Sequence, residues 1–176
     1  MTRVLRPLIW LLTLAYPWLW YYGGSTRLLA LAMAAVWLLR AFGAGKPVHR
    51  AGAAALAAFF ILAALRDTGG SLTLYPLLVN TAMLAVFAAS LIHPPSAIER
   101  IARLQHPDLP PAGVRYTRRI TQIWCGFFIA NGSIIAALAL LHADRAWAWY
   151  TGVISYLLMG ALFAGEWLYR RIRLPA

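Results

Sequence analysis

The stretch IERIARLQHPDLPPAGVRYTRR, from Ile98 to Arg119, decides how the rest of the chain is interpreted. It carries five arginines and two acids, whereas 62% of the whole chain is hydrophobic and only 12% is charged. Typical soluble proteins have roughly 25% charged residues. A soluble fold of this length could not bury so many apolar side chains, so we expect lipid to cover much of the protein surface. We therefore expect this basic stretch to connect membrane-spanning helices.

Six apolar segments predict an all-α polytopic membrane helix bundle in one domain, residues 1–176. A bilayer core of ~30 Å needs about 20 helical residues. The second and third segments are shorter, so one of them is alternatively a re-entrant hairpin. The predicted spans lie near Pro7–Tyr22, Leu28–Phe42, Ala51–Leu65, Leu72–Ile92, Ile123–Leu141 and Trp147–Tyr169.

The basic residues divide unevenly between the two sides of such a bundle. Thirteen of the 16 lysines and arginines fall in the N-terminus, the second and fourth connections and the C-terminus. The remaining three are Arg27, Arg66 and Arg145. The positive-inside rule then places both termini and a loop at 93–122 in the cytoplasm. The net charge of +11 is thus a topology signal, and we expect no nucleic-acid partner.

The cytoplasmic loop begins with a helix signal. Ser96 and Glu99 have the spacing of a capping box, and apolar and basic positions then alternate at helical spacing. We expect a short interfacial helix that ends at HPDLPP, because proline cannot continue a helix. The loop is interpreted as a topological anchor, as a docking surface for anionic phospholipid or a cytoplasmic protein, or as both. The candidate docking residues are Arg100, Arg103, Arg115, Arg118 and Arg119.

Three polar residues within the predicted spans, Glu166, Asn80 and Asn131, form a candidate intramembrane polar site. Glu166 has the i,i+4 spacing of a helical ion pair with Arg170, and arginines at the inner end of the fifth span are alternative partners. Intramembrane charges are costly and often functional. The two asparagines are interpreted either as helix–helix hydrogen-bonding residues or as part of a polar substrate site.

Small residues predict close helix packing in two places. Gly132 follows Asn131 and predicts the close approach of another backbone. In the sixth span, Gly160-x-x-x-Ala164 and Ala161-x-x-x-Gly165 predict a tightly packed face, either within the chain or in a homodimer.

Motifs for catalysis and cofactor binding are not found. The sequence has no G-x-S-x-G, no nucleotide-binding glycine motif and no metal-ligand spacing around its four histidines. Cys125 is the one cysteine and is expected to be a small buried hydrophobe. We predict no catalytic residue, no metal and no cofactor, although the enzyme question stays open.

Several motifs carry a resemblance to a known family. The segments YPLLVN, SLIHPPSAIERIARL, LPPAGVRYTRR, FFIANG and LFAGEWLYRR, between Tyr75 and Arg171, resemble a family of small uncharacterised bacterial inner-membrane proteins. Their genes often lie near aryl-polyene or fatty-acid-like biosynthesis genes, and some members have been mislabelled as a DNA gyrase. The layout is also distantly similar to intracellular septation protein A. The resemblance implies a location and a context, and no catalytic residue.

Three functions follow as hypotheses. The first is a non-catalytic membrane component that supports assembly of the cell envelope or of a lipid-linked product, through docking on Ile98–Arg119. The second is a transporter or flippase for an acyl or lipid-linked molecule, lined by Glu166, Asn80 and Asn131. The third is an integral-membrane enzyme that processes acyl chains.

Overall fold

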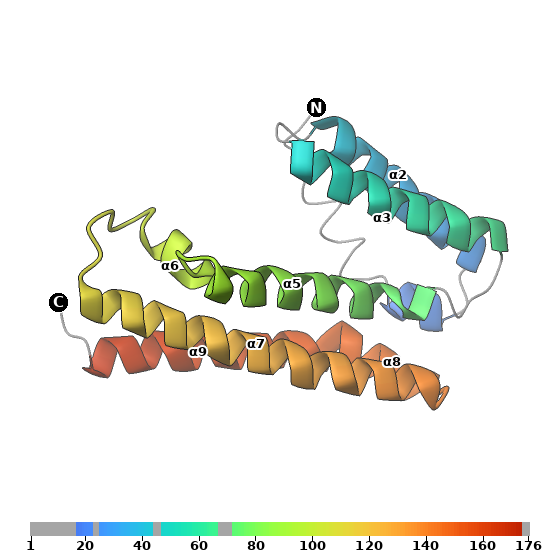
Figure 1. Cartoon of the computed structure of the whole chain (residues 1–176). Helices are drawn as coiled ribbons and strands as arrows, with labels where there is room; N and C mark the ends of the chain where they lie inside the picture. Colours follow the sequence, from blue (N-terminus) through green and yellow to red (C-terminus); the bar gives the residue numbers. More distant parts are fainter. Residues whose placement is uncertain (1–16, 23–24, 44–46, 67–71, 174–176) are drawn as a thin grey trace. The chain divides into compact units, whose positions relative to one another are not determined.

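The computed structural model describes residues 17–22, 25–43, 47–66 and 72–173 (Figure 1). Within these ranges the regular structure is helical, with no strand. The chain divides into two compact units, one from residues 1–75 with 142–154 and the other from residues 76–141 with 155–176. Of the predicted span Pro7–Tyr22, only the last six residues lie within the described ranges.

In the first unit, α2 (Thr26–Gly43) and α3 (Pro47–Arg66) pack against each other as a hairpin. The contact is built largely from alanines, which let the two backbones approach closely. Small side chains repeat every three or four residues along each helix, so one face of each is buried. The buried positions include Ala30, Met33, Ala34, Ala53, Ala57, Phe60 and Ala64.

The first unit also contains α8 (Asp144–Trp149) and the π-helical turn η1 (Tyr150–Ile154). Trp147 meets Trp20 edge to face at 5.0 Å between ring centroids, and Trp149 meets Trp18 at 4.8 Å. Such edge-to-face pairs are favourable beyond their buried area. Residues near the end of the first predicted span therefore pack on the start of the sixth.

The second unit is a bundle of three long helices, α5 (Tyr75–Ile92), α7 (Pro111–Leu140) and α9 (Ser155–Arg173), with the short α6 (Ala97–Ala102). The helix that contains the predicted fifth span is longer than that span, because α7 begins at Pro111, twelve residues before Ile123. Hydropathy detects only the apolar part of a helix. Proline is well suited to the first helical position and arginine is a good helix former, so the basic segment is helical too.

Three helices among the described residues are long and apolar enough to cross a membrane, namely Tyr75–Ile92, Pro111–Leu140 and Asp144–Ile172. The predicted all-α membrane fold is confirmed to this extent, whereas six crossings stay a prediction. At 1.5 Å per residue, the 30 residues of α7 extend about 45 Å, which exceeds a ~30 Å hydrocarbon core. Part of α7 therefore has to leave the hydrocarbon, and its first turns, which carry the arginines, are the polar part.

Candidate functional site

Side chains from α5, α7 and α9 form one hydrogen-bonded chain, which we name the amide clasp (Asn80, Asn131 and Ser155). The Asn131 amide donates to Asn80 Oδ1 at 2.9 Å, and the Ser155 hydroxyl donates to Asn131 Oδ1 at 3.0 Å. The Asn80 amide donates in turn to the carbonyl of Phe128 at 2.6 Å. All three side chains of the clasp are buried, so the clasp joins three helices in the interior of the unit.

Gly132 makes room for the amide clasp. A Cβ atom at this position would lie 2.6 Å from Asn80 Nδ2, which is closer than carbon and nitrogen can approach without a bond. The predicted close approach at Gly132 is therefore present, but it is made by a side chain of α5 and not by a backbone.

Asn80 and Asn131 were expected either to hydrogen-bond neighbouring helices or to form part of a polar substrate site, and the amide clasp distinguishes these roles. Both side-chain polar atoms of Asn80 and both of Asn131 already have hydrogen-bond partners within the protein. Buried polar groups in lipid are stabilised when they are satisfied in this way. The geometry therefore matches helix–helix bonding and leaves these amides few groups to offer a substrate.

Glu166 lies elsewhere, near the end of α9 and opposite the first turns of α7. Its Oε1 accepts a hydrogen bond from the Tyr116 hydroxyl at 3.0 Å and lies 3.4 Å from Arg170 Nε. The ion pair expected with Arg170 is therefore present, whereas Arg118 donates to the carbonyl of Leu91 instead. The rings of Tyr116 and Tyr169 stack above one another, 6.1 Å apart and nearly parallel at 6°.

The structure does not bring the three residues of the predicted polar site together. Ser155, in the amide clasp, and Glu166 are eleven residues apart on α9, which is about 16 Å along a helix. The α7–α9 groove described below is lined by Glu166 and by neither asparagine.

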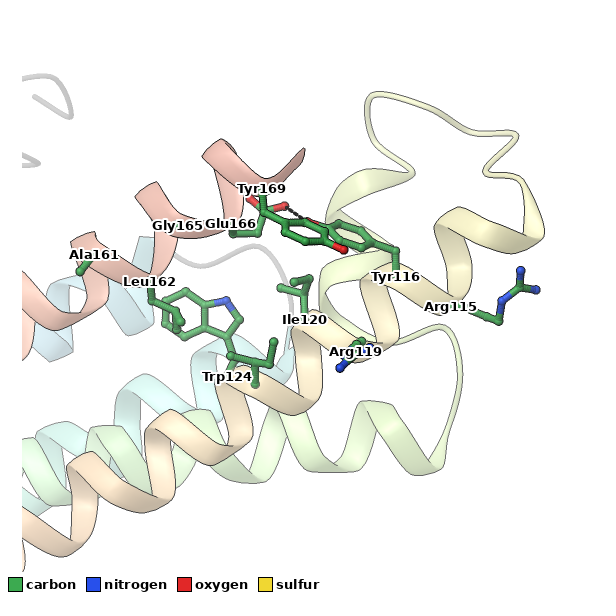
Figure 2. A pocket seen from close by; sticks show the side chains of 11 residues that line it. Arg115, Tyr116, Arg119, Ile120, Trp124, Ala161, Leu162, Gly165, Glu166 and Tyr169 are labelled. Carbon is green, nitrogen blue, oxygen red and sulfur yellow. Dashed lines mark hydrogen bonds between the residues drawn. The ribbon is translucent and has the colours of Figure 1, made fainter. Parts of the chain in front are cut away.

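Beside Glu166, a groove of about 720 Å³ runs between α7 and α9, and we name it the α7–α9 groove (Figure 2). Its apolar part is lined by Ile120, Ile123, Trp124, Ala161 and Leu162. Its polar part is lined by Arg115, Tyr116, Arg119, Glu166 and Tyr169, with Gly165 between the two parts. In Figure 2 the stacked tyrosines and Glu166 lie at one end, and Trp124 and Leu162 lie further along the groove.

The five candidate docking arginines divide into two groups, and the first group holds the loop in place. Arg100 donates to the carbonyls of Pro95 and His93 at 2.8 and 3.3 Å. Arg103 binds the buried Glu99 at 2.8 Å and the carbonyl of Pro107 at 2.9 Å. Arg118 donates to the Leu91 carbonyl at 3.0 Å, at the C-terminal end of α5. These three arginines satisfy backbone carbonyls and are structural.

The second group is Arg115 and Arg119, which line the α7–α9 groove. Neither forms an ion pair or a hydrogen bond with any residue that the structure describes. They are four residues apart on α7 and therefore lie on the same side of the helix. Of the five arginines expected to form a docking surface, Arg115 and Arg119 are therefore the two without a partner among the described residues.

The predicted capping box and short helix are present in the loop. Ser96 is the N-cap of α6, and its N–H donates to Glu99 Oε2 at 3.3 Å. The loop is further tied down because the Ala97 N–H donates to Ser90 Oγ at 2.8 Å and the Ile98 N–H to Thr121 Oγ1 at 3.3 Å. Ile101 and Leu104 are exposed, which leaves an apolar side that a bilayer surface can cover.

The tight packing predicted for the small residues of α9 is not found within the second unit. A Cβ atom added at Gly160 or at Gly165 would meet nothing within 4 Å. Ala161 and Gly165 instead line the α7–α9 groove, where their small size widens it. This small-residue face leaves space and does not serve as a helix contact in the described chain.

Sequence reasoning missed Tyr116, Tyr169 and Ser155. In an antiparallel helix pair, the numbers of facing residues have a nearly constant sum. Once Asn131 is placed opposite Ser155, this rule puts Tyr116 near Glu166. The register between α7 and α9 could not be predicted from the sequence, because no motif indicates that Ser155 faces Asn131.

The described residues include no group of three or more His, Cys, Asp or Glu side chains placed to hold a metal ion. Comparison with known proteins adds no family: no family model, no curated protein and no solved structure matches the chain. Function therefore has to be inferred from the geometry of the second unit.

Proposed function

We propose that the protein is a non-catalytic component of a bacterial inner membrane that supports assembly of the cell envelope or of a lipid-linked product. It acts by docking lipid or a protein partner on the basic cytoplasmic end of α7. The observation that carries the proposal is the pair Arg115 and Arg119, which lie beside the α7–α9 groove without a partner among the described residues. Unpaired arginines at a membrane surface attract anionic groups.

The proposed topology has six spans with both termini in the cytoplasm. The uneven division of basic residues supports it. Trp18 and Trp20 pack on Trp149 and Trp147, as expected where the first span ends and the sixth begins on the same side. Tryptophans of this kind are enriched at membrane interfaces. Membership of the small inner-membrane family is part of the same proposal and depends on the sequence motifs alone.

The proposal is tested by deleting the gene and comparing total lipid and pigment extracts by mass spectrometry. We expect a missing or trapped lipid-linked product, restored by the wild-type gene and not by the double variant Arg115→Gln/Arg119→Gln. The matched control is Arg27→Gln/Arg145→Gln, which removes the same charge from two exposed arginines on the opposite predicted side and should restore the product. Full restoration by the Arg115/Arg119 variant, at equal protein level, would contradict the proposal.

A further inference from the structure

The α7–α9 groove changes polarity along its length. On α7, Arg115, Arg119 and Ile123 follow one another at four-residue spacing, so they form one ridge along the helix. The neighbouring ridge runs from Tyr116 through Ile120 to Trp124 in the same direction. Both ridges therefore begin polar near the start of α7 and become apolar toward the middle of the bundle.

The facing wall on α9 changes in the matching direction. Ala161 and Leu162 lie beside the apolar part of the groove, and Glu166 and Tyr169 lie beside the polar part. A ligand that fits both walls has a polar head at Arg115 and Arg119 and an apolar chain that points into the bundle. The volume of about 720 Å³ is within the roughly 300–1,000 Å³ of small-molecule sites, so the groove suits one such molecule.

The charge of the polar end selects an anion. Arg115 and Arg119 are like charges at i,i+4 spacing, which destabilise each other, and an anion between them removes that cost. The charge of Glu166 is compensated by Arg170, 3.4 Å away, so Glu166 does not neutralise the two free arginines. Guanidinium groups bind phosphate oxygens with two parallel hydrogen bonds, which favours a phosphate over a weaker acceptor.

We propose that the α7–α9 groove binds one anionic phospholipid of the surrounding bilayer, with its phosphate on Arg115 and Arg119 and one acyl chain along Ile123 and Ala161. This inference rests on the proposed function, since both use the same two arginines. It goes further because it names a single bound molecule, its chemical class and its orientation.

The test uses the full chain purified in detergent, with native mass spectrometry as the readout. Phosphatidylglycerol and phosphatidylcholine with identical acyl chains are titrated separately. We expect one phosphatidylglycerol per chain at saturation, with at least tenfold weaker binding of phosphatidylcholine. Because each basic residue near an anionic surface contributes about 1 kcal/mol, Arg115→Gln/Arg119→Gln should weaken phosphatidylglycerol binding about 30-fold.

A second variant fills the groove without changing any charge. A Cβ atom added at Gly165 would meet nothing within 4 Å, and Gly165 lines the groove, so we expect Gly165→Leu to occupy the space for the acyl chain. Gly160→Leu is the matched control, because Gly160 is equally open but does not line the groove. We expect at least tenfold weaker binding for the first variant and unchanged binding for the second, with equal helicity by circular dichroism.

Each other outcome overturns the inference. Equal binding of the two lipids, which both carry a phosphate, would show that the site does not select a net negative charge. Unchanged binding by Gly165→Leu would show that the acyl chain does not lie in the groove. A dimer that is lost in Gly165→Leu, without bound lipid in the wild type, would assign the groove to a second copy of the chain. The proposed function fails separately if the Arg115/Arg119 variant loses lipid in the spectrometer and still restores the deletion strain.

Discussion

Polar side chains of the second unit have partners within the protein in the amide clasp, whereas two arginines at the basic end of α7 have none among the described residues. In the middle, where Asn80, Asn131 and Ser155 form the amide clasp, each amide is hydrogen-bonded to another part of the protein. At the end, Arg115 and Arg119 stand beside the α7–α9 groove with no partner among the described residues. The difference indicates that the middle stabilises the bundle, whereas the end is available to something outside it.

A physical reason supports this division. Unsatisfied polar groups in hydrocarbon cost several kcal/mol, so polar residues in the middle of a bundle have to pair with one another. At headgroup depth water and phosphate are present, so an arginine does not need a partner from the protein. The same helix can therefore contribute to stability in one part and to binding in another.

The largest expected effect is the loss of the amide clasp. Asn131→Leu removes two hydrogen bonds and leaves the Asn80 oxygen and the Ser155 hydroxyl without their partner. We expect the free energy of unfolding, measured by SDS titration in bicelles, to fall by about 2–3 kcal/mol. Ala130→Leu, at the exposed neighbouring position, is the control and should change it by less than about 0.5 kcal/mol. Equal stability of the two variants would show that the clasp does not hold the middle of the bundle together.

The next largest effect is expected for alanine substitutions at two glycines of α7, Gly132 and Gly126. Gly132→Ala forces the Asn80 amide to move and should cost about 1–2 kcal/mol by the same SDS titration, although alanine is the better helix former. Gly126→Ala, at a position with open space, should instead stabilise the helix by up to about 1 kcal/mol.

A double variant identifies the cause of that cost. In an Asn80→Ala background the obstructing amide is gone, so Gly132→Ala should no longer destabilise. Persistence of the cost in the double variant would mean that something other than Asn80 occupies the space beside Gly132.

The smallest effect separates the two groups of arginines. Arg118→Gln removes the hydrogen bond to the Leu91 carbonyl and should lower the free energy of unfolding by about 0.5–1 kcal/mol. Arg115→Gln breaks no contact within the described chain and should leave stability unchanged or slightly higher, since a like-charge pair is relieved. If Arg115→Gln lowered the free energy of unfolding more than Arg118→Gln does, the distinction between structural and free arginines would be wrong.

Much of the fold was accessible from the pattern of residues. The apolar segments at Leu72–Ile92 and Trp147–Tyr169 correspond to helices long enough to cross a membrane. The capping box at Ser96 and the pair of Glu166 with Arg170 were also predicted, because both depend on neighbours three or four residues away. The start of α7 was not predicted, because hydropathy does not register a basic helix that has left the hydrocarbon.

The sequence by itself determined the lipid-embedded character of the chain, the helical class and the local contacts, because composition and short-range spacing are enough for these. Only the tertiary structure decided that Asn80, Asn131 and Ser155 meet, and that Tyr116 lies against Glu166. It also decided that three of the five loop arginines bind carbonyls or Glu99 while two remain beside a groove. These outcomes depend on the register between helices that are far apart in the chain, and the intervening sequence does not encode that register locally.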